Sequence, residues 1–263
     1  MPNKNNYLAK TPNSKGFIDY SDQEHAMWAA LYQRQWPNTQ KYAAHAYNSG
    51  LKKLVMPEHR IPQCQEITEF LEPITGWSVQ PVPALIGFEQ FFTMLAGKRF
   101  PAASFIRGKR DFDYIKEPDI FHEIFGHTPL LADLRFAHFS ELIGKVGKSL
   151  GPKGYQWVIR LYWFTIEFGL SLEGGLYKAL GSGLTSSPTE LLYGLKSTVP
   201  ERRRFNVIDI LRTPYRIDIH QPIYYVIEHL NDLFDVNEKA LLADIKEAQK
   251  RGLFEPTYAQ IDV

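Results

Sequence analysis

The sequence predicts a mainly α fold with a few short β-strands, built as a single domain. Helix-start signals recur along the chain, and no stretch alternates strands with helices in the manner of βαβ units. The chain has 263 residues, 44% of them hydrophobic, and no Gly/Ser/Pro-rich linker divides it, so it can bury one sizeable core. We expect a flexible N-terminal extension over residues 1–20, because this stretch is polar, and one folded domain over residues 21–263.

Capping residues and prolines define the helices expected in the first half of the chain. Ser21 and Glu24 match a capping box, so a helix begins there, and it should stop before Pro37 because proline disrupts helix interiors. Pro118 suits the first turn of a helix, which places His122 on a helix beginning near Glu117. The other elements expected here are helices over residues 39–50, 65–71 and 88–97, an extended link over 81–83 and a strand over 99–106.

Helix-start and helix-stop signals also organise the second half. A long helix should occupy residues 154–172, ended by Gly174 and Gly175. Ser187 and Glu190 match another capping box with Pro188 at the first helical position, so a further helix begins there. The remaining elements expected are short strands near residues 217–219 and helices over 226–233 and 238–249.

The charge balance excludes two classes of partner. The chain carries 30 Lys+Arg and 29 Asp+Glu, a formal net charge of +1, so nothing in its composition attracts nucleic acid or an anionic membrane surface. Arg202, Arg203 and Arg204 are too few for a phosphate-binding stripe and are expected in a solvated helix end or loop. We therefore expect a small-molecule partner, with no nucleic acid and no membrane.

Cys64 is the only cysteine of the chain. An intrachain disulfide is therefore impossible, cysteine-based zinc and iron–sulfur sites are excluded, and the compartment should be reducing. The polar N-terminus lacks the apolar stretch of a secretory signal, and the longest apolar segment, residues 158–172, is too short to span a bilayer. The sequence thus predicts a cytoplasmic protein.

His122 and His127 form the sharpest motif, with Glu123 and Gly126 between them. Five residues of an ideal α-helix turn through about 500°, which leaves the two rings about 140° apart. Both can bind one metal only if the helix ends or distorts between them, and Gly126 and Pro129 provide for a helix end. The alternative is that one histidine is a surface or core residue and the other a cap.

Glu167 is the only charge in the segment 162–170, which is otherwise apolar and aromatic. An ionised carboxylate in such surroundings is costly unless it is paired or bound to a metal. Pairing with Arg160, two helical turns earlier, is one explanation. The other is that Glu167 joins His122 and His127 in a 2-His-1-carboxylate facial triad, the donor set of non-haem Fe(II) oxygenases. Because the same donors suit zinc, the ligand chemistry alone leaves the metal open.

Four segments carry a resemblance to a known family. They are residues 117–130, 162–170, 181–187 and 215–222, and their order and content resemble the pterin-dependent aromatic amino acid hydroxylases over roughly residues 28–231. The resemblance implies a single aromatic amino acid hydroxylase catalytic domain. It also implies hydroxylation of L-phenylalanine to L-tyrosine with O2 and a tetrahydropterin, such as tetrahydrobiopterin, at a mononuclear non-haem Fe(II) centre, in the breakdown of phenylalanine.

The resemblance also implies roles for particular residues. His122, His127 and Glu167 would bind the iron, and no catalytic protein group would be needed beyond this metal centre. Asp119 would hold His122 or a metal-bound water. The pterin-binding residues implied are Phe91, Glu123, Tyr162 and Ile86, and the substrate-binding residues are Arg107, Trp163, Gly183 and Ser186, with Arg107 on the substrate carboxylate.

Trp163 and Ile217 indicate the substrate preference, and a third position, Ile115, departs from the family. At Trp163 the chain resembles the phenylalanine- and tyrosine-hydroxylating members, which also carry tryptophan there. Tryptophan hydroxylases tend to carry phenylalanine at this position. Ile217 is apolar where tyrosine hydroxylases tend to carry aspartate, and an apolar residue suits an unsubstituted ring. Ile115 departs from the threonine of the animal enzymes.

Two other functions fit parts of the pattern. The first is a zinc hydrolase with Glu123 as its base, although zinc peptidases space their histidines four apart rather than five. The second is a non-catalytic helical interaction protein whose histidines are structural. Against the animal hydroxylases, the chain lacks the regulatory domain and the tetramerisation helix, so we expect a monomer.

Overall fold

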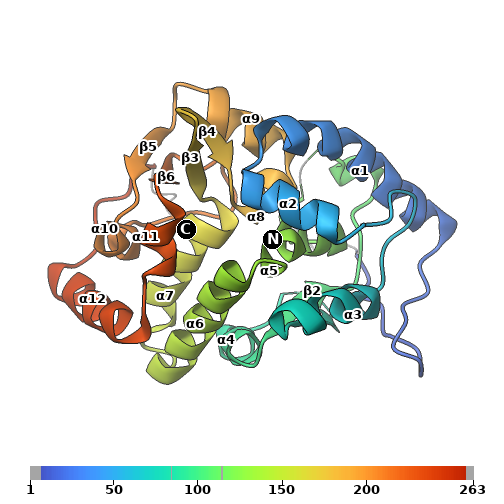
Figure 1. The fold of residues 1–263 in the computed structure, drawn as a ribbon, viewed down its shortest axis with the longest axis horizontal. Coiled ribbons are helices and arrows are strands. Elements are labelled where there is room, and N and C mark those ends of the chain that lie inside the picture. The colour runs from blue at the N-terminus through green and yellow to red at the C-terminus, as the bar shows by residue number, and fades with distance from the viewer. Residues whose placement is uncertain (1–6, 84, 114, 259–263) are drawn as a thin grey trace, which may run out of the picture.

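The computed structural model describes residues 7–83, 85–113 and 115–258. The protein is mainly helical with few and short strands, as the sequence predicts (Figure 1). Helix α6 (Leu134–Leu150) crosses the middle of the molecule and packs against α4 (Phe88–Ala96) and α7 (Tyr155–Tyr162). Among the described residues, no helix is both long enough and apolar enough to cross a membrane.

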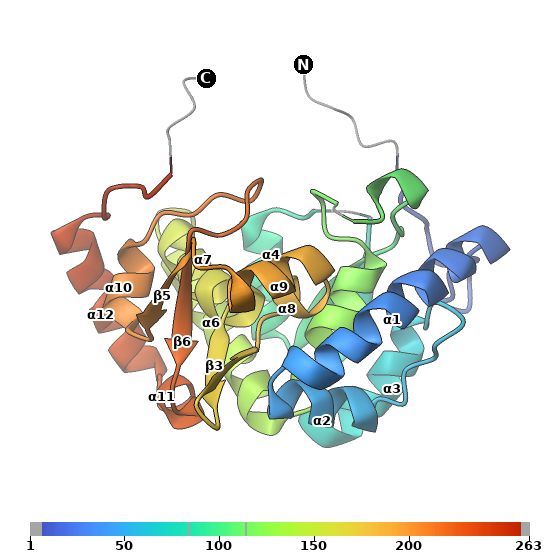
Figure 2. The ribbon, with the colours of Figure 1, turned by 90° about the horizontal axis from the view of Figure 1, so that it is seen from above.

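The remaining helices surround this centre (Figures 1 and 2). Helices α1 and α2 lie together on one side of the molecule, and α10, α11 and α12 lie on the opposite side. Their bounds are α1 (Asp22–Tyr42), α2 (His45–Lys53), α3 (Cys64–Thr75), η1 (Lys109–Asp111), η2 (His122–His127), α5 (Thr128–Leu131), η3 (Trp163–Glu167), α8 (Ser182–Thr185), α9 (Pro188–Lys196), α10 (Val207–Arg212), α11 (Leu230–Phe234) and α12 (Glu238–Arg251).

The strands form two small sheets. Strands β1 (Ser78–Val82) and β2 (Arg99–Ala103) pair in parallel, next to α3 and α4. The second sheet has the order β4-β3-β6-β5, in which β3 and β4 are antiparallel while β6 runs parallel to both β3 and β5. Its strands are β3 (Leu170–Glu173), β4 (Leu176–Ala179), β5 (Glu201–Arg204) and β6 (Ile223–Ile227).

Aromatic packing fixes the helix that carries the histidine motif. Phe121 and Phe125 are fully buried and stack with their ring centroids 4.8 Å apart. Trp28 of α1 meets Phe121 edge to face at 5.2 Å, and the Tyr47 hydroxyl of α2 donates to the Phe125 carbonyl at 2.6 Å. Burying each such side chain contributes about 1.5–3 kcal/mol. The backbone around His122 and His127 is therefore held by the core of the domain.

Two predictions for α1 and α2 are wrong. Helix α1 continues through Pro37 to Tyr42, because contacts with the rest of the fold hold it beyond the proline. Thr39 is fully buried, and the Asn48 side-chain amide donates to the Thr39 carbonyl at 2.9 Å. The chain then turns extended at Ala43, and the Ala44 N–H donates to the Ala179 carbonyl of β4 at 2.8 Å. Residues 39–50 are therefore two helices with a break rather than one helix.

The second half departs from prediction at the sheet. The helix expected over residues 154–172 ends at Glu167, and Gly174 and Gly175 form the β3–β4 hairpin turn with φ of +58° and +78°. Residues 217–219, where a strand was predicted, form no strand. The strand of this region is β6, whose five residues are all buried. Because β6 extends to Ile227, the helix predicted over residues 226–233 is the shorter α11, which starts only at Leu230. An apolar, β-branched and aromatic run of this kind favours a central strand. The arginine cluster lies in the edge strand β5 and not in a helix end or loop.

Other predictions are confirmed. Helices α4, α9 and α12 begin at the predicted residues, and Ser21 forms the predicted capping box with Glu24. The extended link predicted over residues 81–83 overlaps the end of β1. The strand predicted over residues 99–106 begins as expected but is shorter, because β2 ends at Ala103. The helix bearing His122 begins at Ile120, just after Pro118, rather than near Glu117. The boundary predicted between an extension and a domain at residue 20 stays a prediction, and residues 1–6 lie outside the described residues.

Candidate active site

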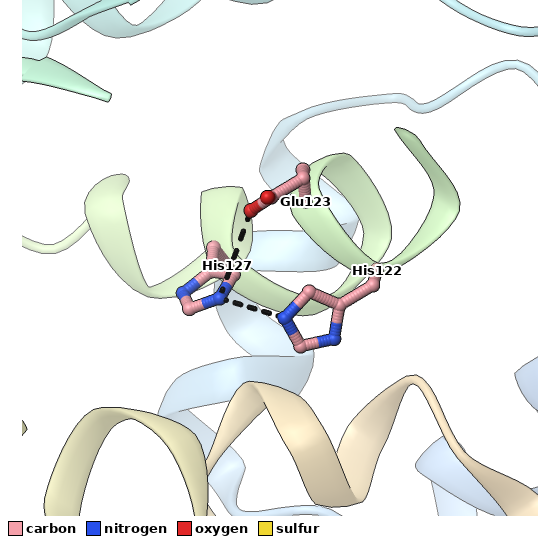
Figure 3. Close-up of side chains that lie close together, drawn as sticks. All are labelled: His122, Glu123 and His127. Carbon is pink, nitrogen blue, oxygen red and sulfur yellow. Dashed lines mark hydrogen bonds and ion pairs between the residues drawn. The ribbon is translucent and has the colours of Figure 1, made fainter. Parts of the chain in front are cut away.

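The two histidines lie at the first and last positions of η2, which is a π-helix. Hydrogen bonds in a π-helix join residues five apart, so His122 and His127 are one turn apart. Their Nε2 atoms lie 3.1 Å from each other (Figure 3). The helix therefore distorts between the histidines, as the spacing required. It does not end there, because α5 continues directly through Pro129 to Leu131.

Gly126 has a packing role in place of the expected helix-ending one. A Cβ at this position would lie 3.0 Å from the Ser182 carbonyl oxygen and 3.1 Å from the Ser182 Cβ. Glycine thus lets η2 approach α8 closely. This contact brings α8, with Ser182 and Ser186, next to the histidines.

Glu167 is the last residue of η3, a second π-helix. Its Oε1 lies 3.0 Å from the Nε2 of His127, and its Oε2 lies 3.5 Å from the Nε2 of His122. Ser182 donates its hydroxyl to the same Oε2 at 2.8 Å. Arg160 is not its partner: that guanidinium donates to the Gln156 carbonyl and lies over the Trp157 ring. Of the two explanations for the buried carboxylate, the structure supports convergence with the histidines.

Protonation states at this cluster suit metal binding. Burial acts to raise the pKa of Glu167, but His127, His122 and the hydrogen bond from Ser182 outweigh it and lower that pKa to about 2. Burial lowers the pKa of His122 to about 4, against the opposing effect of Glu167. Near pH 7 the carboxylate is therefore ionised and the His122 imidazole is neutral, which is the state in which each donates an electron pair to a metal.

Ser186 fixes the tautomer of His122. The Ser186 hydroxyl donates to the Ser182 carbonyl at 2.7 Å, so its oxygen accepts from the Nδ1–H of His122 at 2.9 Å. The Nε2 lone pair of His122 then points toward His127 and Glu167. The Nδ1 of His127 lies 3.4 Å from the Tyr162 hydroxyl, and its ring packs on Phe100 with centroids 4.7 Å apart.

The separations of the donor atoms fit one metal ion. Two donors at right angles, each about 2.1 Å from a metal, lie about 3 Å apart. The Nε2 atoms of the histidines and the oxygens of Glu167 lie 3.0, 3.1 and 3.5 Å apart.

Glu123 is the competing carboxylate. It too is near the pair, and His122, Glu123 and His127 also form a cluster of possible metal ligands. Its Oε2 is 3.9 Å from the Nε2 of His127 (Figure 3). The nearest oxygen of Glu167 is closer to this atom, at 3.0 Å. Burial and then Glu167 raise the pKa of Glu123 well above its usual range, which favours its protonated form over the ionised form that binds a metal. Glu167 is therefore the better ligand.

The three donors open into a cavity of about 450 Å³. This volume suits a small organic cofactor or substrate. Every site residue that the sequence indicated lines this cavity, with the exception of Asp119. The residues are Ile86, Phe91, Arg107, His122, Glu123, His127, Tyr162, Trp163, Glu167, Gly183 and Ser186.

Asp119 is buried behind Arg107. Its two carboxylate oxygens accept from Nε and Nη2 of Arg107, both at 2.8 Å, and one also accepts from the Arg107 backbone N–H at 3.0 Å. It contacts His122 through that residue's backbone N–H at 3.1 Å, whereas the His122 ring bonds to Ser186. Asp119 therefore fixes a guanidinium at the cavity wall and the start of η2, without touching an imidazole.

The structure adds residues for which no role was predicted from the sequence. Trp163 donates its indole N–H to Gln221 Oε1 at 2.9 Å, and its ring stacks on Tyr215 with centroids 4.5 Å apart. The Gln221 backbone N–H donates in turn to Glu190 at 3.0 Å. Gln221 and Tyr215 stand in the segment 215–222 that carries the family resemblance, and Ser182 stands in 181–187. That membership was the only sequence signal for them.

The fold and the cavity define a helical protein with a 2-His-1-carboxylate donor set beside a pocket of ligand size. The sequence profile of the biopterin-dependent aromatic amino acid hydroxylases matches residues 5–251. The chain belongs to this family.

Relatives and solved structures agree. The phenylalanine-4-hydroxylase of Vibrio cholerae is 45% identical over 252 residues, which cover 96% of this chain and 87% of that protein. The apo structure of the cold-active phenylalanine hydroxylase from Colwellia psychrerythraea superimposes with a TM-score of 0.92 at 43% identity, covering 95% and 97% of the two chains. A Chromobacterium violaceum phenylalanine hydroxylase with bound oxidised Fe(III) gives a TM-score of 0.87 at 35% identity, covering 93% and 89%.

Proposed function

We propose that the protein is a phenylalanine 4-monooxygenase, which converts L-phenylalanine to L-tyrosine with O2 and a tetrahydropterin at a mononuclear Fe(II) centre. The observation that carries the proposal is the convergence of His122, His127 and Glu167 within 3.0–3.5 Å at the wall of the cavity. The choice of iron over zinc is supported by the Fe(III) in the Chromobacterium relative. When bound, iron and tetrahydropterin supply the activated oxygen, one atom for the ring and one for the pterin.

The residues of the chain bind and orient the reactants. Arg107 presents a guanidinium to the cavity while Asp119 holds two of its donors from behind. This arrangement suits a substrate carboxylate, because a fixed fork gives a defined orientation. Trp163, Gly183 and Ser186 also line the cavity and would hold the ring and the amino-acid end of the substrate. Holding the reacting atoms in register and excluding water is the contribution of the protein to such a reaction.

The pterin side of the cavity is assigned to Phe91, Ile86, Tyr162 and Glu123. Phe91 and Tyr162 meet edge to face with centroids 5.2 Å apart, so the Phe91 ring has a fixed orientation. Such a ring suits stacking against a flat heterocycle. Burial raises the pKa of Glu123 and so favours the protonated carboxyl, which can both donate and accept a hydrogen bond. The raised pKa lowers the share of ionised carboxylate, which argues against Glu123 as the base of a zinc hydrolase.

The preference for phenylalanine rests on apolar residues of the wall. Ile115 and Ile217 both line the cavity. A tyrosine substrate would need a polar partner for its phenol, because a buried hydroxyl without one costs about 1–3 kcal/mol. These two side chains supply none, which favours an unsubstituted ring.

Product identification tests the proposal. Purified protein would be loaded with Fe(II) and given tetrahydrobiopterin, O2 and, separately, each of phenylalanine, tyrosine and tryptophan. We expect tyrosine to form from phenylalanine, with O2 uptake, and slower reaction of the other two. An enzyme that is active with zinc and consumes no O2 would contradict the assignment.

We also propose that the protein is a monomer of the cytoplasm, that tetrahydrobiopterin is its pterin and that it acts in phenylalanine breakdown. The near-neutral charge and the single cysteine support the cytoplasmic location. Light scattering would test the oligomeric state, and a tetramer would refute the monomer. Comparing KM values for different tetrahydropterins would test the choice of cofactor.

A further inference from the structure

The segment of residues 7–20, here called the N-terminal strap, lies against the loop that carries Arg107. The Tyr7 ring stacks on the Phe105 ring with centroids 5.4 Å apart and planes 10° from parallel. The Tyr7 hydroxyl accepts from the Gly108 backbone N–H at 3.0 Å and donates to the Asp111 carboxylate. Tyr7 therefore holds the residue two positions before Arg107 and the residue directly after it.

Two further contacts join the strap to the start of this loop. The Lys10 backbone N–H donates to the Ser104 Oγ at 2.9 Å, and the Tyr20 hydroxyl donates to the Ser104 carbonyl at 3.3 Å. The strap is itself fixed at Lys10. The Lys10 ammonium forms an ion pair with Glu24 in the first turn of α1 and donates to the Asp19 carbonyl at 2.9 Å.

The loop needs this support because residues 104–108 form neither helix nor strand. On the inner side, Asp119 binds the guanidinium and backbone of Arg107, and the Ile120 N–H donates to the Phe105 carbonyl at 2.8 Å. On the outer side, the support described above comes from the strap. Arg107 is thus held between the start of the helix that carries the metal ligands and a segment far earlier in the chain. Tyr7 and Gly108, for example, are 101 residues apart in the sequence.

We propose that Tyr7 is a positioning residue for the substrate: it holds the loop so that the Arg107 guanidinium meets the carboxylate of the amino acid. This inference rests on the proposed function, in which Arg107 binds that carboxylate. The simpler alternative is that the strap only stabilises the fold. The two differ in what they predict for ligands with and without a carboxylate.

The test uses the full-length, metal-loaded protein and the variant Tyr7→Phe, which keeps the ring stack and removes both hydrogen bonds of the hydroxyl. Losing such bonds typically changes an equilibrium about two- to tenfold. We expect Kd and KM for L-phenylalanine to rise by this factor, with KM for the pterin and the metal content unchanged. Binding of 2-phenylethylamine, which has no carboxylate, should be the same for variant and parent. Tyr177→Phe, on the exposed part of β4, is the matched control and should change nothing.

Ser104→Ala provides a second variant, since it removes the bond from Lys10 without altering Tyr7. It should also weaken L-phenylalanine and spare 2-phenylethylamine. If both variants lower only the melting temperature, or weaken both ligands equally, the strap is merely structural and the proposal is wrong. Separate measurements test the proposed function and the role of Tyr7. Tyrosine formation by the parent protein tests the proposed function. The ratio of the affinities for the two ligands, measured by calorimetry, tests the role of Tyr7.

Discussion

The Nε2 atoms of His122 and His127 lie 3.1 Å apart although five positions separate the residues in the sequence. A π-helical turn makes this possible, and the carboxylate that faces them ends a second π-helix. Single π-helical turns are rare and occur frequently at functional sites. Such a turn needs support from the surrounding packing. Here Phe125, fully buried, and Gly126, against Ser182, provide that support. The metal site is thus built from two distorted helices whose distortions place the ligands.

Two matched variants, Glu167→Gln and Glu123→Gln, test which of the two carboxyl groups binds the metal. The first change removes a negative charge from the donor set, and we expect metal affinity to fall by more than about 100-fold, with loss of hydroxylation. The second replaces a carboxyl whose raised pKa favours the protonated form with a neutral amide of similar shape. The metal content of this variant should stay close to that of the parent protein. Metal analysis after dialysis measures both, and equal loss from the two variants would show that Glu123 is also a ligand.

Gly126→Ala tests the contact that supports the π-helix. The new methyl group would meet the Ser182 carbonyl at 3.0 Å, so η2 and α8 must move apart. Overpacking of this kind costs about 1–3 kcal/mol of unfolding free energy. Because His127 follows Gly126 directly, metal affinity should fall as well. Thermal unfolding with and without Fe(II) measures both effects. Gly87→Ala is the control, since a Cβ there meets nothing within 4 Å and φ is −65°; a melting temperature lowered equally in both variants would rule out the contact as the cause.

The sequence indicated a distortion between the histidines but not its kind. Spacing alone required the helix to end or to distort, and Gly126 and Pro129 favoured an end. What decides between them is Ser182, which approaches η2 from a later part of the chain, and no local pattern contains that contact. The same reason explains the error at Leu170: its segment has the composition of a buried helix or of a strand, and pairing with β4 and β6 selects the strand.

Residues with intrinsic chemistry were predictable, while their hydrogen-bond partners were not. Histidines and a lone carboxylate in apolar surroundings are conspicuous in any sequence. Ser182 and Gln221 are ordinary polar residues, and their importance appears only when folding brings them to Glu167 and Trp163. Helix α6 was likewise not predicted from local signals, although it forms the centre of the fold.

Trp163 and Gln221 should act as a coupled pair in substrate binding. The indole N–H donates to Gln221 Oε1, so Gln221→Met leaves a donor without its acceptor and frees the ring to shift. We expect a three- to tenfold rise in KM for L-phenylalanine, by the typical value of about 1 kcal/mol for such a bond. Trp163→Phe removes the donor as well as ring area. In the double variant, the Gln221 change should then cost about 1 kcal/mol less than it does alone. Additive costs in this cycle would show that the bond does not position the ring.

The ion pair between Arg107 and Asp119 should make stability depend on pH. Burial acts to raise the pKa of Asp119, but Arg107 and its hydrogen bonds outweigh burial and hold that pKa below the ordinary 3.8. Between the folded and unfolded pKa values the unfolded chain therefore binds more protons, so unfolding free energy rises with pH there. The contribution is complete above about pH 5 and is lost as pH falls below about 4 toward the lowered pKa.

Asp119→Asn should remove this part of the acid dependence. At neutral pH it should cost about 3–5 kcal/mol, because the buried guanidinium loses its counter-charge. Asp218→Asn is the matched control: Asp218 also binds a guanidinium through both oxygens, that of Arg216, but on the surface, where such pairs contribute little. Urea unfolding at pH 3.5 and pH 7 measures all three proteins, and a parent-like pH difference in Asp119→Asn would assign the acid dependence to other carboxylates such as Glu167.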